Sequence, residues 1–438
     1  MLVFAHGIVG RADLPIPEAM FGAAAAAVLV ISFLALATLW SQPRLEHPRE
    51  RRLFGLPLAA DVVLGSLGVL VLALTAYAGL AGTDSQRDNI APWLVYVAFW
   101  VGVPFASLVL GDVWRLISPW RAIGRAAGLV AARVGGDEPP APLPYPERLG
   151  RWPAAAGVVG FGICELCWAT AREPAPVAVL MLIYVVAMLV GASVYGVEQW
   201  TRNADAFGVY FAMFAALSPV ARRDGVLYAR RPFVGAVREI DGRVAGTAAV
   251  VLAGIGVTAF DGAAEGPLFN EALPRLQDFF GGLGFGPERA LELGFTTGLL
   301  GSVALVGLIW VAARPGPRLA HSLAPILAAY VVAHYFSLLA YNGQDIARLA
   351  SDPLGDGSDL FGAADSGIDY GVVSATAIWY VQVVALVVGH VAALMLAHDR
   401  ALVVHGSHRA ATRSQIVMLL LMVCFTCLGL WLLSAANG

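Results

Sequence analysis

A few ionisable and amide side chains interrupt the long apolar stretches of this sequence, and they are the first candidates for chemistry. Glu165 lies in the apolar stretch 152–171, His334 in 319–341, and Gln382 in 371–397. A charged group at the centre of a bilayer costs ~2.5–3.5 kcal/mol or more to insert, so it needs a partner or water. Imidazole acts as a general base near neutral pH and also binds transition metals. We therefore expect His334 to be catalytic, with Gln382 at a similar depth; a hydrogen-bonded packing role for His334 is the alternative.

Glu165 stands inside one of two CxxC pairs, Cys164–Cys167 and Cys424–Cys427. Four thiolates can form a tetrahedral metal site, but cysteine in a spanning helix usually packs as a small apolar residue, and packing is the expected role. An acid at that depth is different, because it must meet a partner or a water-filled cavity. We expect Glu165 to carry protons or contact a substrate; a structural hydrogen bond to another span is the alternative.

The segment 342–370 joins two apolar stretches and is strongly acidic. It holds six aspartates and a single cation, Arg348. Carboxylates in a glycine-rich turn can ligate a hard cation such as calcium, although the spacing here does not match the twelve-residue EF-hand loop. Asp352, Asp356 and Asp359 are the candidate metal ligands, and a solvated acidic loop is the alternative.

The N-terminal segment adds a further candidate ligand, His6. Residues 3–5 have the small-residue pattern that precedes a leader-peptide cleavage site, so His6 would become the mature N-terminus if translation starts upstream. If this segment folds over the external ends of the spans, His6, His334 and Asp345 would form a cluster able to bind a divalent metal ion and activate water. No phosphate-binding glycine loop, His-Glu-x-x-His or Gly-x-Ser-x-Gly motif is present, so the sequence names no other cofactor.

The elements that must position these residues are membrane-spanning helices. Hydrophobic residues make up 58% of the 438 residues and charged residues only 13%, well below the charged fraction of a soluble domain. A spanning helix needs ~20 apolar residues, and ten stretches meet that requirement: 18–40, 57–81, 92–112, 152–171, 176–197, 244–261, 290–313, 319–341, 371–397 and 414–435. We predict an all-α, polytopic bundle of about ten helices that forms a single domain, 1–438, in the lipid bilayer.

The arginines orient this bundle. All but six of the 28 basic residues fall in alternate connections, and there is no lysine. By the positive-inside rule these connections are cytoplasmic. The prediction is a protein of the cell membrane with both termini external, an external N-terminal segment 1–17, cytoplasmic connections 113–151 and 198–243, and the acidic loop 342–370 outside. The net charge of −3 argues against a nucleic-acid partner.

Two of the cytoplasmic segments interleave large apolar residues with arginines, which is typical of helices that lie in the membrane interface. In 113–135, Trp114, Trp120 and Leu129 alternate with Arg121 and Arg125; in 205–221, a run of aromatic residues precedes Arg222 and Arg223. We therefore expect two cytoplasmic, interfacial amphipathic helices beside the spans.

Five segments stand out as a set: His6-Gly-Ile-Val-Gly-Arg-Ala-Asp-Leu-Pro-Ile-Pro17, the stretch from Gly111 to Arg121, His334-Tyr-Phe-Ser-Leu338, the stretch from Asp352 to Gly362, and the stretch from Trp379 to Arg400. Together they resemble a family of actinobacterial-type, multi-spanning proteins commonly labelled fenitrothion hydrolase. The resemblance covers most of the chain. It implies hydrolysis of an organophosphate triester, and it carries over no assigned catalytic residues.

Three functions are compatible with these observations. The first is a membrane hydrolase with an externally facing metal or His/Asp site, which would act on a small-molecule ester. The second is a proton-coupled transporter of a small molecule, with Glu165 and His334 on the proton or substrate path. The third is a metal-handling subunit that works with a membrane or periplasmic protein partner, for which His6 would be a metal ligand.

Overall fold

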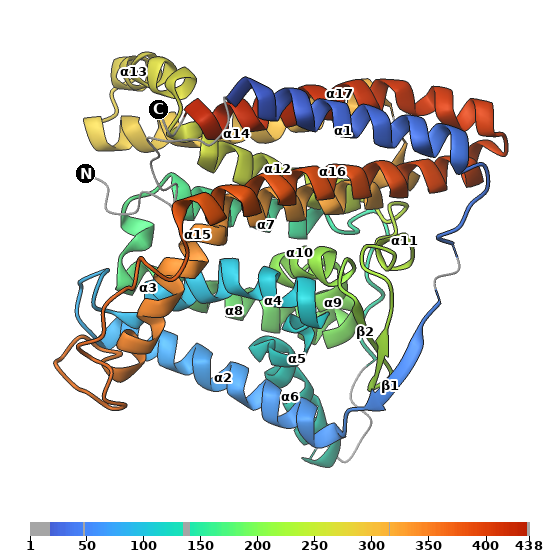
Figure 1. Cartoon of the computed structure of the whole chain (residues 1–438). Helices are drawn as coiled ribbons and strands as arrows, with labels where there is room; N and C mark the ends of the chain where they lie inside the picture. The colour runs from blue at the N-terminus through green and yellow to red at the C-terminus, as the bar shows by residue number, and fades with distance from the viewer. Residues whose placement is uncertain (1–17, 47–48, 135–140, 315, 436–438) are drawn as a thin grey trace.

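The computed structural model describes residues 18–46, 49–134, 141–314 and 316–435, most of which are helical (Figure 1). A helix occupies each of the ten apolar stretches. These helices are α1 (Glu18–Leu39), α2 (Leu58–Ala81), the continuous α3, η1 and α4 (Ile90–Trp93, Leu94–Gly102 and Val103–Leu110), α7 (Trp152–Leu166), α8 (Pro174–Tyr195), α12 (Thr247–Ala264), α14 (Pro287–Ala313), α15 (Ala324–Ser351), α16 (Ala375–His405) and α17 (His408–Ala435).

Within the described residues, seven of these helical stretches are long and apolar enough to cross a membrane, and α1 and α7 supply shorter apolar stretches. Their outer surfaces are apolar as well. On α2, Leu58 and Leu70 are 77% and 66% exposed, and on α14, Leu308 and Val311 are 65% and 69% exposed. Water does not favour so continuous an apolar surface, whereas lipid does. The helices therefore have the character of membrane spans.

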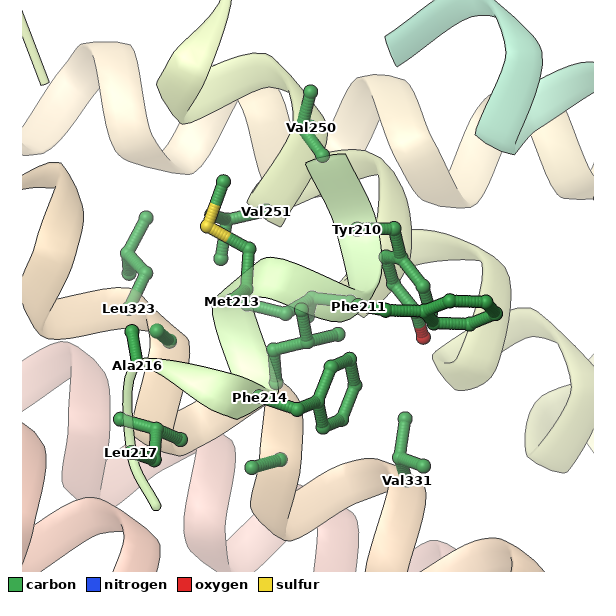
Figure 2. Close-up of a cluster of buried hydrophobic side chains, with 14 of the residues drawn as sticks. Tyr210, Phe211, Met213, Phe214, Ala216, Leu217, Val250, Val251, Leu323 and Val331 are labelled. Atoms are coloured by element: carbon green, nitrogen blue, oxygen red, sulfur yellow. The ribbon is translucent and has the colours of Figure 1, made fainter. Parts of the chain in front are cut away.

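A short helix that we predicted to lie in the membrane interface is instead at the centre of the molecule. Eight of the ten residues of α10 (Ala206–Ala215) are buried, and Tyr210, Phe211 and Phe214 pack with Val250 of α12 and Val331 of α15 (Figure 2). The prediction was wrong because α10 is apolar around its whole circumference, and its arginines come only after it ends. A helix that is hydrophobic all round is buried rather than interfacial.

The other predicted interfacial segment, 113–135, forms two helices, α5 (Trp114–Ile117) and α6 (Pro119–Val134). The start of α6 is buried at Trp120 and Arg121, while Leu129 and Val130 farther along are exposed. The remaining short helices connect the spans: η2 (Thr170–Arg172), α9 (Val197–Asn203), α11 (Ala236–Glu239), α13 (Pro267–Gly282) and η3 (Pro317–Leu323).

A three-stranded antiparallel sheet, which the all-helical prediction did not include, lies at one end of the bundle. Its strands are β1 (Arg51–Gly55), β2 (Val220–Arg223) and β3 (Val226–Ala229), in the order β1-β3-β2. The turn between β2 and β3 places Asp224 and Gly225 at φ +47° and +74°, which suits a tight hairpin. Because β1 pairs with β3, the connection after α1 and the connection after α10 lie at the same end of the helices.

The ends of the bundle differ in character. Asp399, near the end of α16, accepts hydrogen bonds from the indole of Trp40 and the backbone of Arg44. The connection after α1 and the connection after α16 therefore lie side by side, at the end of the bundle that carries the sheet (Figure 1). The acidic loop lies at the other end, where the Leu354 carbonyl accepts a hydrogen bond from the Thr83 backbone. The grouping of connections that the arginine pattern predicts is therefore the grouping found.

Candidate functional site: a buried acid–histidine cluster

A buried polar contact joins α12 to α15. Asp261 is in the last turn of α12, and its Oδ2 atom lies 2.9 Å from His334 Nε2 and accepts a 2.8 Å hydrogen bond from the Tyr335 hydroxyl. Asp261 and His334 are each 7% exposed and Tyr335 is 1% exposed. A buried carboxylate is tolerated only when donors satisfy it, and α15 supplies two donors from adjacent residues.

This geometry determines how the imidazole can act. An ionised Asp261 can only accept hydrogen bonds, so Nε2 of His334 carries the hydrogen between them and Nδ1 is the basic nitrogen. The backbone of Gly262 leaves room beside Nδ1, since a Cβ atom placed on that glycine would be 3.7 Å from it. A proton that arrives at Nδ1 would form an imidazolium stabilised by Asp261, so the pair can accept and release a proton.

Glu165 lies beside this pair, on α7. Its side chain is buried, and Oε2 has no hydrogen-bond partner among the described residues. The Asp261 carboxyl is one of its electrostatic neighbours. Two buried acids that feel each other's charge cannot both be ionised without an energetic cost. Glu165 is therefore a candidate for proton exchange.

A small cavity adjoins Glu165. It has a volume of about 30 Å³ and is lined by Pro92, Trp93, Tyr96, Val97, Glu165, Arg172 and Leu338. That volume holds a water molecule or two. Arg172 donates to the backbone carbonyls of Glu165 and Leu166, at 2.6 and 3.2 Å, and so caps the end of α7. The cavity can therefore bring water to the carboxyl group that lacks a partner.

The wall opposite Glu165 is built by an unusual helix. Residues Leu94–Gly102 form a π-helix, η1, between α3 and α4. Tyr96 of this segment donates a 2.7 Å hydrogen bond to the Ala171 carbonyl, and Trp100 stacks on Tyr210 with ring centroids 4.9 Å apart. π-Helical turns are rare and occur often at functional sites. This segment tethers α3 and α4 to the chain that surrounds Glu165.

Glu265 extends the cluster toward the surface. It follows α12 by one residue, is exposed, and has Asp261 and His334 as electrostatic neighbours. A series of ionisable groups thus runs from exposed Glu265 through His334 and Asp261 to Glu165 and its cavity.

Among the predicted catalytic residues, His334 contacts Asp261, and Asp261 is an electrostatic neighbour of Glu165; Asp345 lies apart from them. Gln382 is buried on α16. Asp345 pairs with Arg348 at 2.7 Å and stands eleven residues beyond His334 on α15, which is about 16 Å at 1.5 Å per residue. The structure therefore does not bring Asp345 to His334.

The predicted metal ligands of the acidic loop serve the loop itself. Asp352 accepts hydrogen bonds from the backbone N–H groups of Asp356 and Gly357, both at 3.0 Å, and Asp359 accepts one from Ala364. Slight burial would raise the pKa of Asp352, but these donors lower it below its ordinary value. Within the described part of the chain, no group of three or more His, Cys, Asp or Glu side chains is arranged to hold a metal ion; His6 lies outside the described residues.

Asp261 is the candidate site residue that sequence reasoning missed. The predicted span 244–261 ended at this residue, where an acid is normally solvated. The signal that could have found it is the apolar continuation after it: α12 runs to Ala264, so Asp261 belongs to the helix and faces the bundle. No family model, curated protein or solved structure matches the chain, so its function is argued from this cluster.

Proposed function

We propose that this chain is a ten-span protein of the cell membrane, with both termini outside, and that it couples movement of a small molecule to movement of protons. The observation that carries the proposal is the buried Asp261–His334 pair beside Glu165, whose carboxylate oxygen Oε2 has no hydrogen-bond partner among the described residues. Ionisable groups inside a membrane bundle that face one another form proton relays in pumps and transporters.

The size of the adjoining cavity favours proton transfer over substrate chemistry at this point. Its volume of about 30 Å³ admits water but is at least roughly ten times smaller than the ~300–1,000 Å³ of a small-molecule pocket. Exchange of one proton between His334 and Glu165, with Asp261 holding the imidazole, needs only water and small side-chain movements. Proton transfer is then coupled to movement of the substrate through α7, α12 and α15, the helices that carry Glu165, Asp261 and His334.

The test is proton flux in proteoliposomes that enclose a pH-sensitive dye. A panel of small organic anions and cations is added under an imposed pH gradient, and compound-dependent proton movement is recorded for the wild type, Glu165→Gln and His334→Ala. We expect flux with at least one compound, and loss of that flux in both variants with the folded protein retained. The matched control is Glu173→Gln. Glu173 is exposed and directly precedes α8, so it lies near the end of α7 that carries Glu165, and this variant should keep the flux. Undiminished flux in Glu165→Gln and His334→Ala would refute the relay.

A hydrolase is the second candidate, because a histidine held by a carboxylate is also the arrangement of a general base. The resemblance to proteins labelled fenitrothion hydrolase suggests the substrate for the assay. Hydrolysis of fenitrothion by the purified protein, abolished in His334→Ala and Asp261→Asn and unaccompanied by proton flux, would favour this function over transport. A stoichiometric bound metal that is lost in His6→Ala and His334→Ala would support its metal-dependent form, or a metal-handling subunit.

A further inference from the structure

A second cavity lies at the arginine-rich end of the bundle, and none of the residues of the acid–histidine cluster lines it. It has a volume of about 390 Å³, within the ~300–1,000 Å³ range of small-molecule sites. Its walls come from α5, the start of α6, α9, one face of α10 and strand β2, which lie together in Figure 1. It is a hollow built by several elements rather than a groove along one helix.

Seven arginines and four acidic residues line this cavity, so its walls carry a surplus of positive charge. Two of the lining arginines, Arg115 and Arg121, share one carboxylate, Glu198, at 3.0 Å, and Arg125 outside the lining pairs with it as well, at 2.7 Å. Burial alone would raise the pKa of Glu198, but the three guanidinium groups hold it below its ordinary value. Glu198 is therefore ionised and already fully engaged.

Two further arginines line the cavity without a carboxylate partner. Arg151 donates a hydrogen bond to the Thr247 hydroxyl at 3.2 Å, and neither Arg151 nor Arg202 forms an ion pair with any residue that the structure describes. Burial lowers the pKa of Arg151, and the nearby Arg202 lowers it further against the attraction of Asp241. Two like charges face the same space, which is unfavourable unless an anion joins them.

The cavity also contains buried donors with no partner among the described residues. Ser118 is 3% exposed and its Oγ atom has no hydrogen bond, and the Nε atoms of Arg151 and Arg222 are likewise unsatisfied. A buried donor left without a partner is unfavourable, because it has lost its hydrogen bonds to water and gained none. Such donors gathered around a positively charged hollow indicate a place for a ligand that accepts several hydrogen bonds.

We infer that this cavity binds a phosphate-bearing anion, held by Arg151, Arg202, Arg115 and Ser118. The guanidinium fork matches phosphate oxygens in pairs, and the surplus of positive charge suits a group that carries close to two negative charges better than a single carboxylate. The phosphate can belong to a soluble small molecule or to a lipid headgroup. The idea that this anion is the transported molecule rests on the proposed function. The inference that the cavity binds an anion is independent of that function.

The experiment measures thermal stabilisation and isothermal titration of the full chain in nanodiscs of phosphatidylcholine, with inorganic phosphate as the probe. Arg202→Gln and Ser118→Ala are the test variants. Arg202 is exposed and without an ion pair among the described residues, and Ser118 Oγ has no partner, so neither change should impair folding. Arg133→Gln, on the exposed end of α6 outside the cavity, is the matched control.

We expect phosphate to bind the wild type and the control equally, and each test variant roughly ten-fold more weakly or worse, as for loss of one charge-assisted hydrogen bond. In a second arm, the free phosphate is omitted and the nanodiscs contain phosphatidylglycerol. If these nanodiscs stabilise the wild type but not the test variants, and free phosphate has no effect, the site binds a lipid headgroup. Equal responses of the wild type and Arg202→Gln, or no response in either arm, would overturn the inference. Because binding is measured without a pH gradient, its failure leaves the proton-flux test unaffected, and the reverse also holds.

Discussion

At the residue scale, the two buried acids of the cluster differ in the number of hydrogen-bond donors around their carboxyl oxygens. Asp261 is stabilised by two donors, His334 and Tyr335, whereas Glu165 Oε2 has none among the described residues. The first carboxyl group is therefore fixed by its donors, whereas the second has an oxygen atom that can take a proton or a water molecule, as the proposed relay requires. A relay needs both kinds of group, since one anchors the imidazole and the other exchanges the proton.

The hydrogen bonds to Asp261 predict a graded effect on stability. Tyr335→Phe removes one donor to a charged group and should lower the free energy of unfolding by about 1.5–3 kcal/mol. Asp261→Ala leaves both donors buried without their acceptor and should cost more, about 3–5 kcal/mol. Unfolding in detergent micelles measures both, with Tyr380→Phe, an exposed tyrosine on α16, as the unchanged control. An Asp261→Ala protein as stable as Tyr335→Phe would contradict the pairing described here.

Glu198 predicts a pH dependence of stability. Its pKa is lower in the folded protein than in the unfolded chain, so its contribution is present above the unfolded value, ~4.3, and is lost as the pH falls through the folded value. Glu198→Gln should lower the melting temperature at pH 7 and flatten its decline below about pH 4.5. Glu147→Gln, at an exposed position with no ion pair among the described residues, should melt as the wild type does. An unaltered pH profile in Glu198→Gln would rule out this role.

At the scale of the elements, close approach of helices depends on small residues. Gly68 of α2 packs against the end of α5 so closely that a Cβ atom there would lie 1.7 Å from the Ile117 carbonyl oxygen. In lipid, where helices gain little from hiding apolar surface, such close packing supplies much of the association energy. The position of α5, and with it the wall of the arginine-lined cavity, thus depends on a residue without a side chain.

Gly68→Ala should therefore separate α2 from α5 and destabilise the protein by roughly 1–3 kcal/mol, the usual cost of overpacking. Gly301→Ala on α14 is the matched control, because nothing lies within 4 Å of a Cβ atom at that position, and alanine there should be neutral or stabilising by about 0.5–1 kcal/mol. Melting temperatures of the two variants in the same detergent provide the comparison. If Gly68→Ala melts no lower than Gly301→Ala, the contact of α2 with α5 is looser than described.

At the scale of the whole molecule, the two ends of the bundle have opposite charge. The sheet lies at one end, and the acidic loop after α15 lies at the other (Figure 1). Strand β2 and several arginines line the anion cavity, whereas the cavity beside Glu165 is lined by residues of α3, which packs against the start of the acidic loop. A molecule that moves an anion together with protons would need both features, one to concentrate the anion and one to exchange protons.

This arrangement predicts the topology directly. Single cysteines introduced at Asp224, in the β-hairpin turn, and at Ser358, in the acidic loop, should be labelled from opposite sides of the membrane, with Asp224 reached only from the cytoplasm. A cysteine at Arg51 on β1 should behave like the one at Asp224, because β1 and β3 are paired. Labelling of the hairpin and the acidic loop from the same side would refute the ten-span arrangement.

The sequence by itself indicated that the helices are suited to a lipid environment, and it determined where they lie along the chain. Lipid selects for continuous apolar stretches, and the length of each stretch follows from the thickness of the bilayer, so a helix occupies every predicted span. The arginine pattern likewise determined which connections share an end, because the membrane sorts positive charge between its two sides. Glu165 and His334 could be singled out for the same reason, since an ionisable residue is conspicuous in an apolar stretch.

Only the tertiary structure decided which helices meet. Lipid tails are as apolar as leucine, so a helix face that contacts lipid and one that contacts another helix have similar compositions. For that reason the local pattern could not place α10 at the centre of the bundle, pair Asp261 with His334, or show that Asp345 lies apart from them. The anion cavity is the strongest case: its arginines come from connections far apart in the sequence, and they surround a common space only because α9, α10 and β2 pack against α5 and α6.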